Sequence, residues 1–430
     1  MTQYSGWGRN IRSQVNAEEV SGKRGYLAVG SRRSYGDSSL NSGGIAVETS
    51  HLRDIKISDS GLATCGAGVT IGELERAALR RGYFPGVVPG TEFVTLGGAF
   101  ASDVHGKSHH INGSFSKATS WIVMRLASDE RTRFDQGSNE FWASAGGMGL
   151  TGVIEEIQLQ LVKIETSYVA VQNRRVADLD EMFNTINAFD VDNPYTVAWV
   201  DLSGDFRGRG IVSSGRHAMR AELNSSQKKS PFRYSDVSKF NLPDVFPKKT
   251  INSTSVKLFN EFWFHKVAKD GVSEIQKFMH PLDSIGSWNR LYGRDGFLQY
   301  QFVVPLHQTA FIYLVMQELK KLRVGSFLSV LKRFGEESMG HLSFPMPGWT
   351  LAVDIPVGID GLDKVLNMLD RKLLEAGGRI YLTKDSRMSS EDIKYMYPRI
   401  NEWRAIRDRM DPINRWQSDQ SRRLRLCKMD

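Results

Sequence analysis

The sequence predicts an α+β protein of two domains. The chain has 430 residues, which exceeds the usual size of a single hydrophobic core. Its first 165 or so residues are dense in glycine and alternate short strands with turns, whereas longer strands and helices follow from about residue 166. We therefore expect one domain over residues 1–165, a second over residues 166–384, and a C-terminal segment, residues 385–430, that returns to the first domain.

Short strands and one helix are expected to build the first domain. The strands lie in "YLAVG", "GIAVE" and "LATCGAG". The stretch "TIGELERAALRRG" places Ile71, Leu74 and Ala78 at helical spacing, and Gly82 ends the helix. In "GLTGVIEEIQLQLVKIE" the apolar residues mostly follow a period of two, which predicts a half-buried strand.

The second part of the chain predicts an α/β cap of antiparallel sheet and helices. Amphipathic helices are expected in "TAFIYLVMQELKKLR" and "GLDKVLNMLDRKLLEAGGR", and Gly377 and Gly378 end the second one before a strand in "RIYLTKD". Residues 224–255 show little periodicity and contain several prolines, so they form either a mobile lid or a plain surface excursion. The last 45 residues predict a helix in "YPRINEWRAIRDRMDP" and an extension.

Charge and cysteine content limit the class of partner and compartment. Lys and Arg outnumber Asp and Glu by 56 to 48, without a block of five or six like charges. This excess suits a phosphate-bearing ligand or an anionic membrane surface, and it does not require nucleic acid. The two cysteines exclude a disulfide scaffold in practice. Because the sequence has neither a signal-peptide pattern nor a long apolar run, we expect a cytoplasmic protein, with peripheral contact at the inner membrane face left open.

Three glycine-rich stretches predict a large, flat, phosphate-bearing cofactor. In "GSRRSYGD", Gly30 to Asp37, backbone amides can converge on phosphate oxygens while Arg32 or Arg33 supplies charge. This stretch has neither the Rossmann spacing nor a Walker lysine, and by itself it is more often an ordinary surface loop. The stretches "VVPGTEFVTLGGAFASDVHGKSHHINGSF" and "WASAGGMGLTGVI" repeat the pattern and favour the cofactor.

These three stretches resemble the FAD-binding domain of the vanillyl-alcohol oxidase type. In addition, "GFLQYQFVVP", "SFPMPGW" and "YLTKDSR" resemble the decaprenylphosphoryl-β-D-ribose 2-oxidase family, and the resemblance runs from Gly6 almost to the C-terminus. It implies a PCMH-type FAD-binding fold with a substrate cap. It also implies oxidation of the 2-hydroxyl of a polyprenyl-phosphoryl ribofuranose, with an NAD(P)H-dependent keto-sugar reductase as partner. The alternative is a soluble sugar, alditol or aldonolactone oxidase that uses oxygen.

The resemblance also implies site residues. The implied catalytic residues are Lys384 and His105, and the implied substrate-binding residues are Tyr35, Gln299, Gln301, Lys332 and Asp354. The implied cofactor-binding residues are Ala28, Val29, Gly30, Ser31, Arg32, Arg33, Ser34, Tyr35, Gly36, Asp37, Ser38, Gly90, Thr95, Leu96, Gly97, Gly98, Ser102, Asp103, Val104, His105, Ile154 and Tyr381. Many oxidases of the superfamily tether flavin through a histidine at the kind of position that Arg33 occupies, so FAD is expected to be noncovalent. Family members carry a cysteine where Ala352 stands.

Several of these residues have a second interpretation. Lys384 could pair with Asp385 at a strand end, and Gln299 and Gln301, which share one side of a strand, could face solvent. Histidines 105, 109 and 110 with Asp103 could form a metal cluster, but neighbouring glycines disfavour a ligand-bearing helix, and we expect no metal. Aromatic residues of the second domain are more often core than ligand platform, although some could line a path for a lipid tail; they are Trp199, Phe327 and Trp349.

Overall fold

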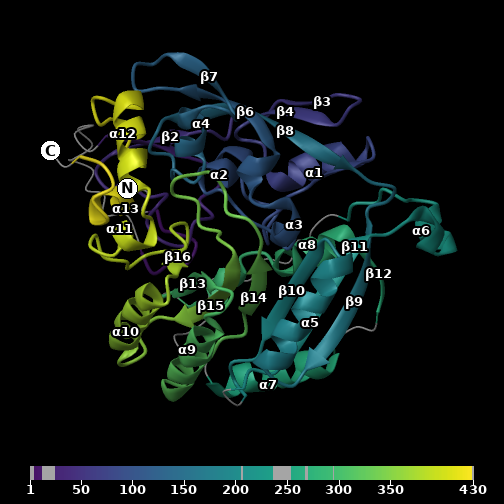
Figure 1. Cartoon of the computed structure of the whole chain (residues 1–430). Coiled ribbons are helices and arrows are strands. Elements are labelled where there is room, and N and C mark those ends of the chain that lie inside the picture. Colours follow the sequence, from purple (N-terminus) through teal and green to yellow (C-terminus); the bar gives the residue numbers. More distant parts are fainter. Residues whose placement is uncertain are drawn as a thin grey trace.

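Two sheets, one above the other, organise the molecule (Figure 1). The computed structural model describes residues 4–11, 25–204, 207–235, 253–266, 270–293 and 295–428. The upper part holds a six-stranded sheet and a parallel pair of strands, and the lower part holds an eight-stranded antiparallel sheet. The fold is α+β, with the two parts expected of a PCMH-type FAD-binding fold and its cap.

The upper part consists of short strands and helices. The parallel pair is β1 (Tyr26–Val29) and β2 (Ile45–Glu48). The six-stranded sheet contains β3 (Ile55–Ile57), β4 (Leu62–Gly66), β5 (Tyr83–Pro85), β6 (Thr119–Arg125), β7 (Arg131–Asp135) and β8 (Val153–Lys163). The helices are α1 (Ile71–Leu79), α2 (Leu96–Ala101), α3 (His109–Asn112) and α4 (Asn139–Ser144).

The expected helix near residue 71 is confirmed as α1. It begins at a capping box, in which the Thr70 hydroxyl accepts from the Glu73 amide and the Glu73 carboxylate accepts from the Thr70 amide. Its apolar residues Ile71, Leu74 and Ala78 are buried against the sheet. Gly82 lies beyond its end at φ +75°, a conformation that glycine adopts without strain.

The lower part is the cap. Its sheet runs in the order β12 (Gly271–Glu274), β9 (Tyr168–Val176), β11 (Gly210–His217), β10 (Tyr195–Val200), β14 (Ser329–Phe334), β15 (Gly348–Pro356), β13 (Phe297–Pro305) and β16 (Arg379–Ile380). Its helices are α5 (Leu179–Asp192), α6 (Ser225–Lys228), α7 (Ser253–Lys266), α8 (Ile275–Met279), α9 (Thr309–Lys321) and α10 (Leu362–Glu375).

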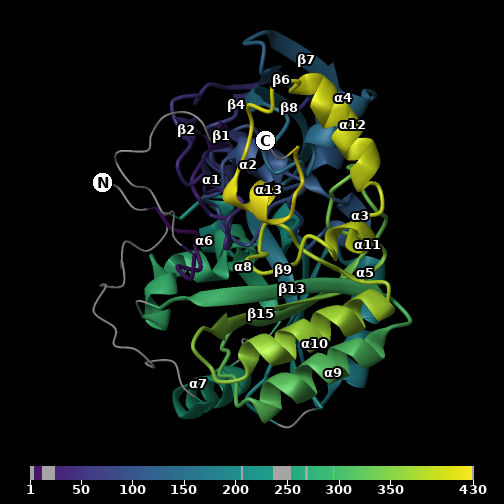
Figure 2. The same cartoon turned by 90° about the vertical axis from the view of Figure 1, so that its left-hand side faces the viewer.

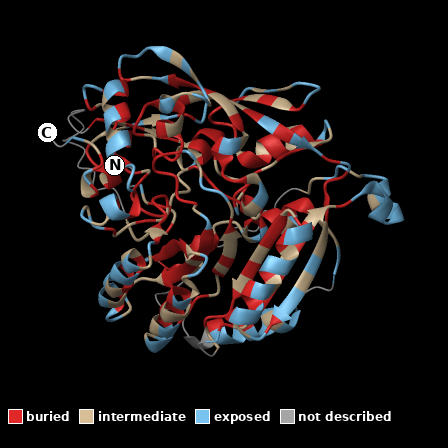
Figure 3. Ribbon diagram, in the orientation of Figure 1, coloured by how far each residue is buried: buried red, intermediate tan, exposed pale blue. Residues whose placement is uncertain are grey.

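Helices α5, α9 and α10 cover the face of this sheet that points away from the upper part (Figure 1). Each is buried on the side that meets the sheet and exposed on the other (Figure 3). Because side chains alternate along a strand, residues such as Tyr300, Leu331 and Val353 pack against these helices. The intervening residues of the same strands face the upper part of the molecule.

The strand expected in "RIYLTKD" is shorter than predicted. Only Arg379 and Ile380 pair with β13, and residues 381–384 form a turn in which the amides of Lys384 and Asp385 both donate to the Tyr381 carbonyl. The chain leaves the sheet edge there because the Thr383 carbonyl accepts from the Tyr35 amide of the upper part. The turn therefore carries Lys384 towards the glycine-rich loops.

The C-terminal helices α11 (Ile393–Met396), α12 (Ile400–Met410) and α13 (Asp419–Arg423) lie beside the upper part (Figure 2). The Trp403 indole donates to the Ala143 carbonyl of α4 at 2.9 Å, and the buried Arg407 side chain donates to the Leu150 carbonyl at 3.2 Å. In α13, Arg423 pairs with Asp37 at 2.7 Å. Helix α12 confirms the helix expected in "YPRINEWRAIRDRMDP".

The predicted lid falls largely outside the described residues. Residues 224–235 of that stretch include the short helix α6, whereas residues 236–252 are not described. Among the helices that the structure describes, none is long and apolar enough to cross a membrane.

Candidate active site

A cavity of about 1470 Å³ lies between the glycine-rich loops and the cap sheet. Its floor is the sheet face opposite α5, α9 and α10. The strand residues that line it include Val171 and Asn173 of β9, Val197 and Trp199 of β10, Ile211 and Ser213 of β11, Val330 and Lys332 of β14, Gln299 and Gln301 of β13, and Ala352 of β15. The solvent-facing alternative for the two glutamines is wrong, because both are buried.

The roof of the cavity is built from close-packed backbone. Gly30 ends β1 so near to Thr95 that a Cβ at residue 30 would lie 2.2 Å from the Thr95 hydroxyl oxygen. At Gly90, by contrast, a Cβ would meet nothing within 4 Å, so this backbone borders open cavity space. The Thr95 hydroxyl accepts from the Gly98 amide and begins α2, which lines the same wall. Such a bare backbone surface suits a flat ligand.

Polar groups of the loop after β1 line this space without hydrogen-bond partners in the described part of the chain. Among the described residues, the buried atoms without a hydrogen-bond partner include Nε of Arg33 and the hydroxyls of Ser38 and Ser39. The Arg33 guanidinium is held between Trp7 and Phe93, at 4.1 and 5.0 Å from the ring centroids. Buried polar groups normally have partners, and charge-assisted donors of this kind bind phosphate oxygens well. The residues present therefore fit a dinucleotide such as FAD.

His105 lies where α2 leads into the cavity and is neutral. The Gln301 amide donates to His105 Nε2 at 3.1 Å, so the ring proton lies on Nδ1, which has no partner among the described residues. Burial and the nearby Lys332 hold the pKa of His105 well below its usual value. Phe334 and Tyr381 pack against the imidazole with ring centroids at 4.7 and 5.1 Å.

Lys384 lines the cavity and is half-buried. Its Nζ lies 3.5 Å from the centroid of the Tyr35 ring, and no ion pair of Lys384 is found in the described part of the chain. Burial lowers the pKa of Lys384, although the negative charge of Asp354 opposes this shift. The alternative pairing with Asp385 does not form, because the Asp385 carboxylate accepts from Arg423 instead.

Asp354 lies behind this group. Its Oδ1 accepts from the Gln299 amide at 2.6 Å, whereas Oδ2 is buried without a partner in the described residues. Burial raises the pKa of Asp354, and the Gln299 hydrogen bond and the charge of Lys384 counteract this. Asp354 does not line the cavity, and its charge acts from outside the lining to raise the pKa of Lys384.

Two further lysines of the cavity lining, Lys332 and Lys107, also have lowered pKa values. Burial, with the charges of Lys107 and Lys384, lowers the pKa of Lys332 to about 7. Burial likewise lowers the pKa of Lys107 to about 8, although Asp283 raises it. The Lys107 ammonium donates to the Met279 carbonyl at 2.8 Å. An anionic group entering here would stabilise the charged form of both lysines.

Most of the residues expected from the sequence come together in this cavity. Five of them do not line it: Gly36, Asp37, Leu96, Asp103 and Asp354. Asp37 is paired with Arg423, Leu96 is in the core, and the Asp103 carboxylate accepts from the Ser116 amide and the Ser343 hydroxyl. These side chains support the shape of the loops from behind. No group of three metal-ligating side chains is found within the described ranges.

The cavity also contains residues that sequence reasoning missed. Lys107 and Asp283 border it, as do Trp7 and Trp288. Lys107 follows His105 by two positions in the second glycine-rich stretch, and that proximity was the available signal. Of the three aromatic residues weighed from the sequence, Trp199 and Phe327 line the cavity, whereas Trp349 is core and packs on Phe183 at 4.6 Å.

Comparisons with known proteins agree with this site. The family model for the FAD binding domain matches residues 20–130. The chain is 38% identical over 427 residues to the decaprenylphosphoryl-β-D-ribose oxidase of Mycolicibacterium smegmatis, covering 97% of this chain and 92% of that protein. It is 29% identical over 367 residues to an uncharacterized protein in the mprA 5' region of Streptomyces coelicolor, covering 83% of this chain and 100% of that protein.

Fold, cavity and family model together define an FAD-dependent oxidoreductase. More narrowly, the chain belongs to the decaprenylphosphoryl-β-D-ribose oxidase family.

Proposed function

We propose that this flavoprotein oxidises the 2-hydroxyl of a polyprenyl-phosphoryl ribofuranose to the 2-keto sugar. This would be the first half of an epimerisation that yields an arabinose donor for cell-wall or glycan synthesis. The observation that carries the proposal is a half-buried lysine with a lowered pKa, Lys384, which lines the same cavity as the glycine-rich loops and the two glutamines of β13. The name of the Mycolicibacterium relative supports the choice of substrate.

The loop after β1 and the start of α2 would hold FAD. In this proposal Arg33, Ser38 and Ser39 bind phosphate oxygens, while Gly97 and Gly98 let the ring system lie against backbone. Bound FAD supplies the acceptor for the hydrogen and electron pair that leave the sugar carbon. Arg33 cannot form the histidyl tether of related oxidases, so the cofactor would be noncovalent.

Lys384 would remove the hydroxyl proton. A lysine can accept a proton only while neutral, and burial favours the neutral form at Lys384. Loss of the proton to Nζ leaves the alkoxide electron pair to form the C=O bond as the carbon-bound hydrogen departs. Gln301, held by its hydrogen bond to His105, would orient the sugar hydroxyls beside this lysine.

Lys332, together with Gln301, would hold the sugar phosphate. Because burial destabilises its ammonium in the free protein, the singly charged phosphodiester of an incoming substrate would restore the charged form and gain a strong hydrogen bond. The prenyl chain would then lie along the apolar part of the cavity floor, over Trp199, Phe327 and Val330.

The proposed setting of the reaction is the cytoplasm, with peripheral contact at the inner membrane face, where a lipid-linked sugar is found. A separate NAD(P)H-dependent reductase would return the 2-hydroxyl with inverted configuration, since the keto sugar must be reduced to complete an epimerisation.

Anaerobic mixing tests the proposed function. With prenyl-phosphoryl ribose in excess, the yellow absorbance of the bound flavin should disappear, and Lys384→Met should slow this by about 10²- to 10⁴-fold. Lys394→Met, on the exposed part of α11, is the matched control and should behave as the natural protein. Bleaching by simple alditols but not by prenyl-phosphoryl ribose would instead identify a soluble sugar or alditol oxidase.

A further inference from the structure

Helix α7 lies at the lower end of the cap (Figure 1) and carries a stripe of exposed, large apolar side chains. Leu258, Phe259, Phe262 and Trp263 have exposed fractions of 70, 45, 58 and 44%. Their spacing of one, three and one residues places them on one side of the helix. The outer face of a surface helix is usually polar, so a stripe of this kind marks an interaction surface.

The stripe belongs to a helix that is fixed to the cap from its other side. Val256 is buried, and the Asn260 amide, also buried, donates to Asp201 Oδ1 at 2.8 Å and to the Ser326 carbonyl at 3.4 Å. Because these contacts set the rotation of α7, the apolar side chains cannot turn inward without breaking them. The exposure is therefore built into the fold of the cap.

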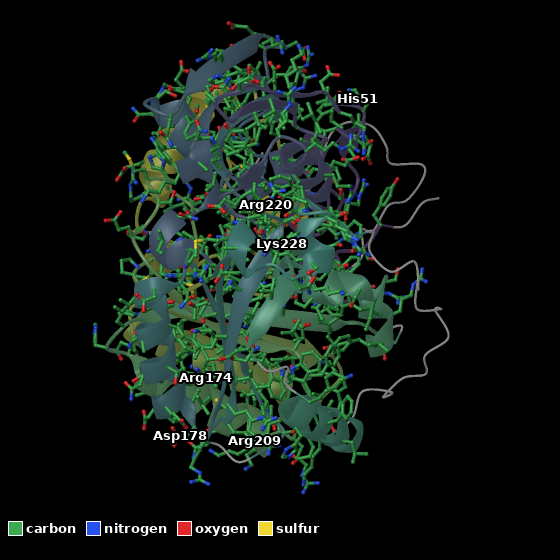
Figure 4. All side chains as sticks on the ribbon, turned by 90° about the vertical axis from the view of Figure 1, so that its right-hand side faces the viewer. His51, Arg174, Asp178, Arg209, Arg220 and Lys228 are labelled. Carbon is green, nitrogen blue, oxygen red and sulfur yellow. The ribbon has the colours of Figure 1, made fainter. Side chains whose placement is uncertain are left out.

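Two lysines flank the stripe, and the one carboxylate of the described helix is paired with an arginine. The Glu261 carboxylate of α7 is bound by Arg209, a residue labelled in Figure 4 near the lower end of the molecule. Lys266 lies with Nζ 5.0 Å from the Phe262 ring centroid, and Lys257 is exposed on the same helix. An apolar stripe flanked by lysines is the pattern of a helix that lies in the interface of an anionic bilayer.

The stripe is continuous with the apolar part of the cavity. Phe259 and Trp263 belong to both, since they line the cavity as well. Phe259 packs on Phe327 with ring centroids at 6.0 Å, and the Phe327 carbonyl accepts from the Trp199 indole of the cavity floor at 3.1 Å. An apolar chain could therefore pass from the outer surface of α7 to the cavity floor along aromatic side chains alone.

We propose that α7 is an interfacial helix that inserts Leu258, Phe259, Phe262 and Trp263 into the surface of an anionic lipid bilayer. Docking in this way would open the cavity directly onto the membrane that holds a prenyl-phosphoryl sugar, and this choice of occupant rests on the proposed function. A second copy of the chain that covered the apolar stripe with its own α7 would bring the same lysines to the contact instead of an anionic surface.

Vesicle flotation of the holoenzyme tests the docking surface. The natural protein should float with vesicles of 30% phosphatidylglycerol in phosphatidylcholine, and Leu258→Ser with Phe262→Ser should lower its partition by about tenfold or more. Both residues lie outside the cavity lining, so flavin content and turnover of a water-soluble, short-chain prenyl-phosphoryl ribose should stay unchanged. The control pair Val191→Ser with Ile413→Ser removes exposed apolar residues elsewhere and should bind vesicles as the natural protein does.

Equal flotation of the double variant and the natural protein, or no flotation of either, would overturn the docking surface. A dimer of the natural protein that becomes a monomer in the double variant would overturn it too, because a second copy would then cover the stripe. Turnover of the soluble substrate reports separately on the proposed function: vesicle binding without turnover would reject the function and leave the docking surface intact.

Discussion

Lys384 shows how a single residue acquires its chemistry from its surroundings. Its ammonium group lies over the Tyr35 ring, and the opposite charge that acts on its pKa is that of Asp354. Burial favours the neutral amine, while Asp354 favours the charged form, and burial prevails. The balance between these two effects sets the pH at which the residue can accept a proton.

The pH profile of flavin reduction should report this balance. In the proposed mechanism the neutral amine is the active form, so the rate should rise with pH, about tenfold per unit, and level off above the lowered pKa of Lys384. Asp354→Asn removes the charge that raises the pKa of Lys384, so the midpoint should move to lower pH. Stopped-flow measurement of the absorbance loss gives both profiles. A midpoint that does not move, or moves to higher pH, would show that Lys384 is not the titrating base.

At the scale of elements, the C-terminal helix α13 supports the loop that follows β1. Arg423 lies between two buried carboxylates, with Asp37 at 2.7 Å and Asp385 at 2.8 Å. Its third donor reaches the Met388 carbonyl at 2.7 Å. The Arg423 guanidinium thus binds the loop of the proposed cofactor site and the turn that carries Lys384, and it holds both to the C-terminal helix α13.

Arg423→Met should therefore destabilise the protein by about 3–5 kcal/mol, because it leaves two buried carboxylates without their partner. Arg422→Met, which breaks the neighbouring and more exposed pair with Asp419 and a hydrogen bond to Gln417, should cost about 1 kcal/mol or less. Urea unfolding of the two variants gives these free energies. Equal losses in both variants would contradict the tying role of Arg423.

On the scale of the whole molecule, the cavity is the space between the upper part and the cap. Its roof comes from residues before 155 and its floor from strands after 165, while Tyr381 and Lys384 close it from the turn after β16. A cofactor held in this space contacts the folded arrangement and loses those contacts when the chain unfolds. Binding and folding are consequently linked.

Added FAD should raise the melting temperature of the flavin-free protein. At a concentration of about 1,000 times Kd the added stability is about 4 kcal/mol. A noncovalently bound FAD is held only by contacts of the folded protein. Heating the holoenzyme should therefore release FAD into solution in the same transition that unfolds the protein. Calorimetry and the fluorescence of free flavin measure the two events. Flavin that stays with the precipitated chain would indicate a covalent link.

The local elements could be predicted from the sequence because neighbouring residues specify them. The capping box at Thr70, the period of two in β8 and the helical spacing in α9 and α10 are each legible within about fifteen residues. The glycine-rich stretches indicated a flat, phosphate-bearing ligand for the same reason, and the family resemblance supplied the site residues.

Only the tertiary structure decided how these pieces meet. The bond between Gln301 and His105 joins residues 196 positions apart, and the pair of Arg423 with Asp37 joins residues 386 apart, so no local pattern contains either contact. The expected strand through Lys384 ends early because the Tyr35 amide binds the Thr383 carbonyl, a partner from the other end of the chain. Periodicity and turn chemistry are properties of adjacent residues, whereas burial, and with it the pKa of Lys384, depends on everything that packs around the group.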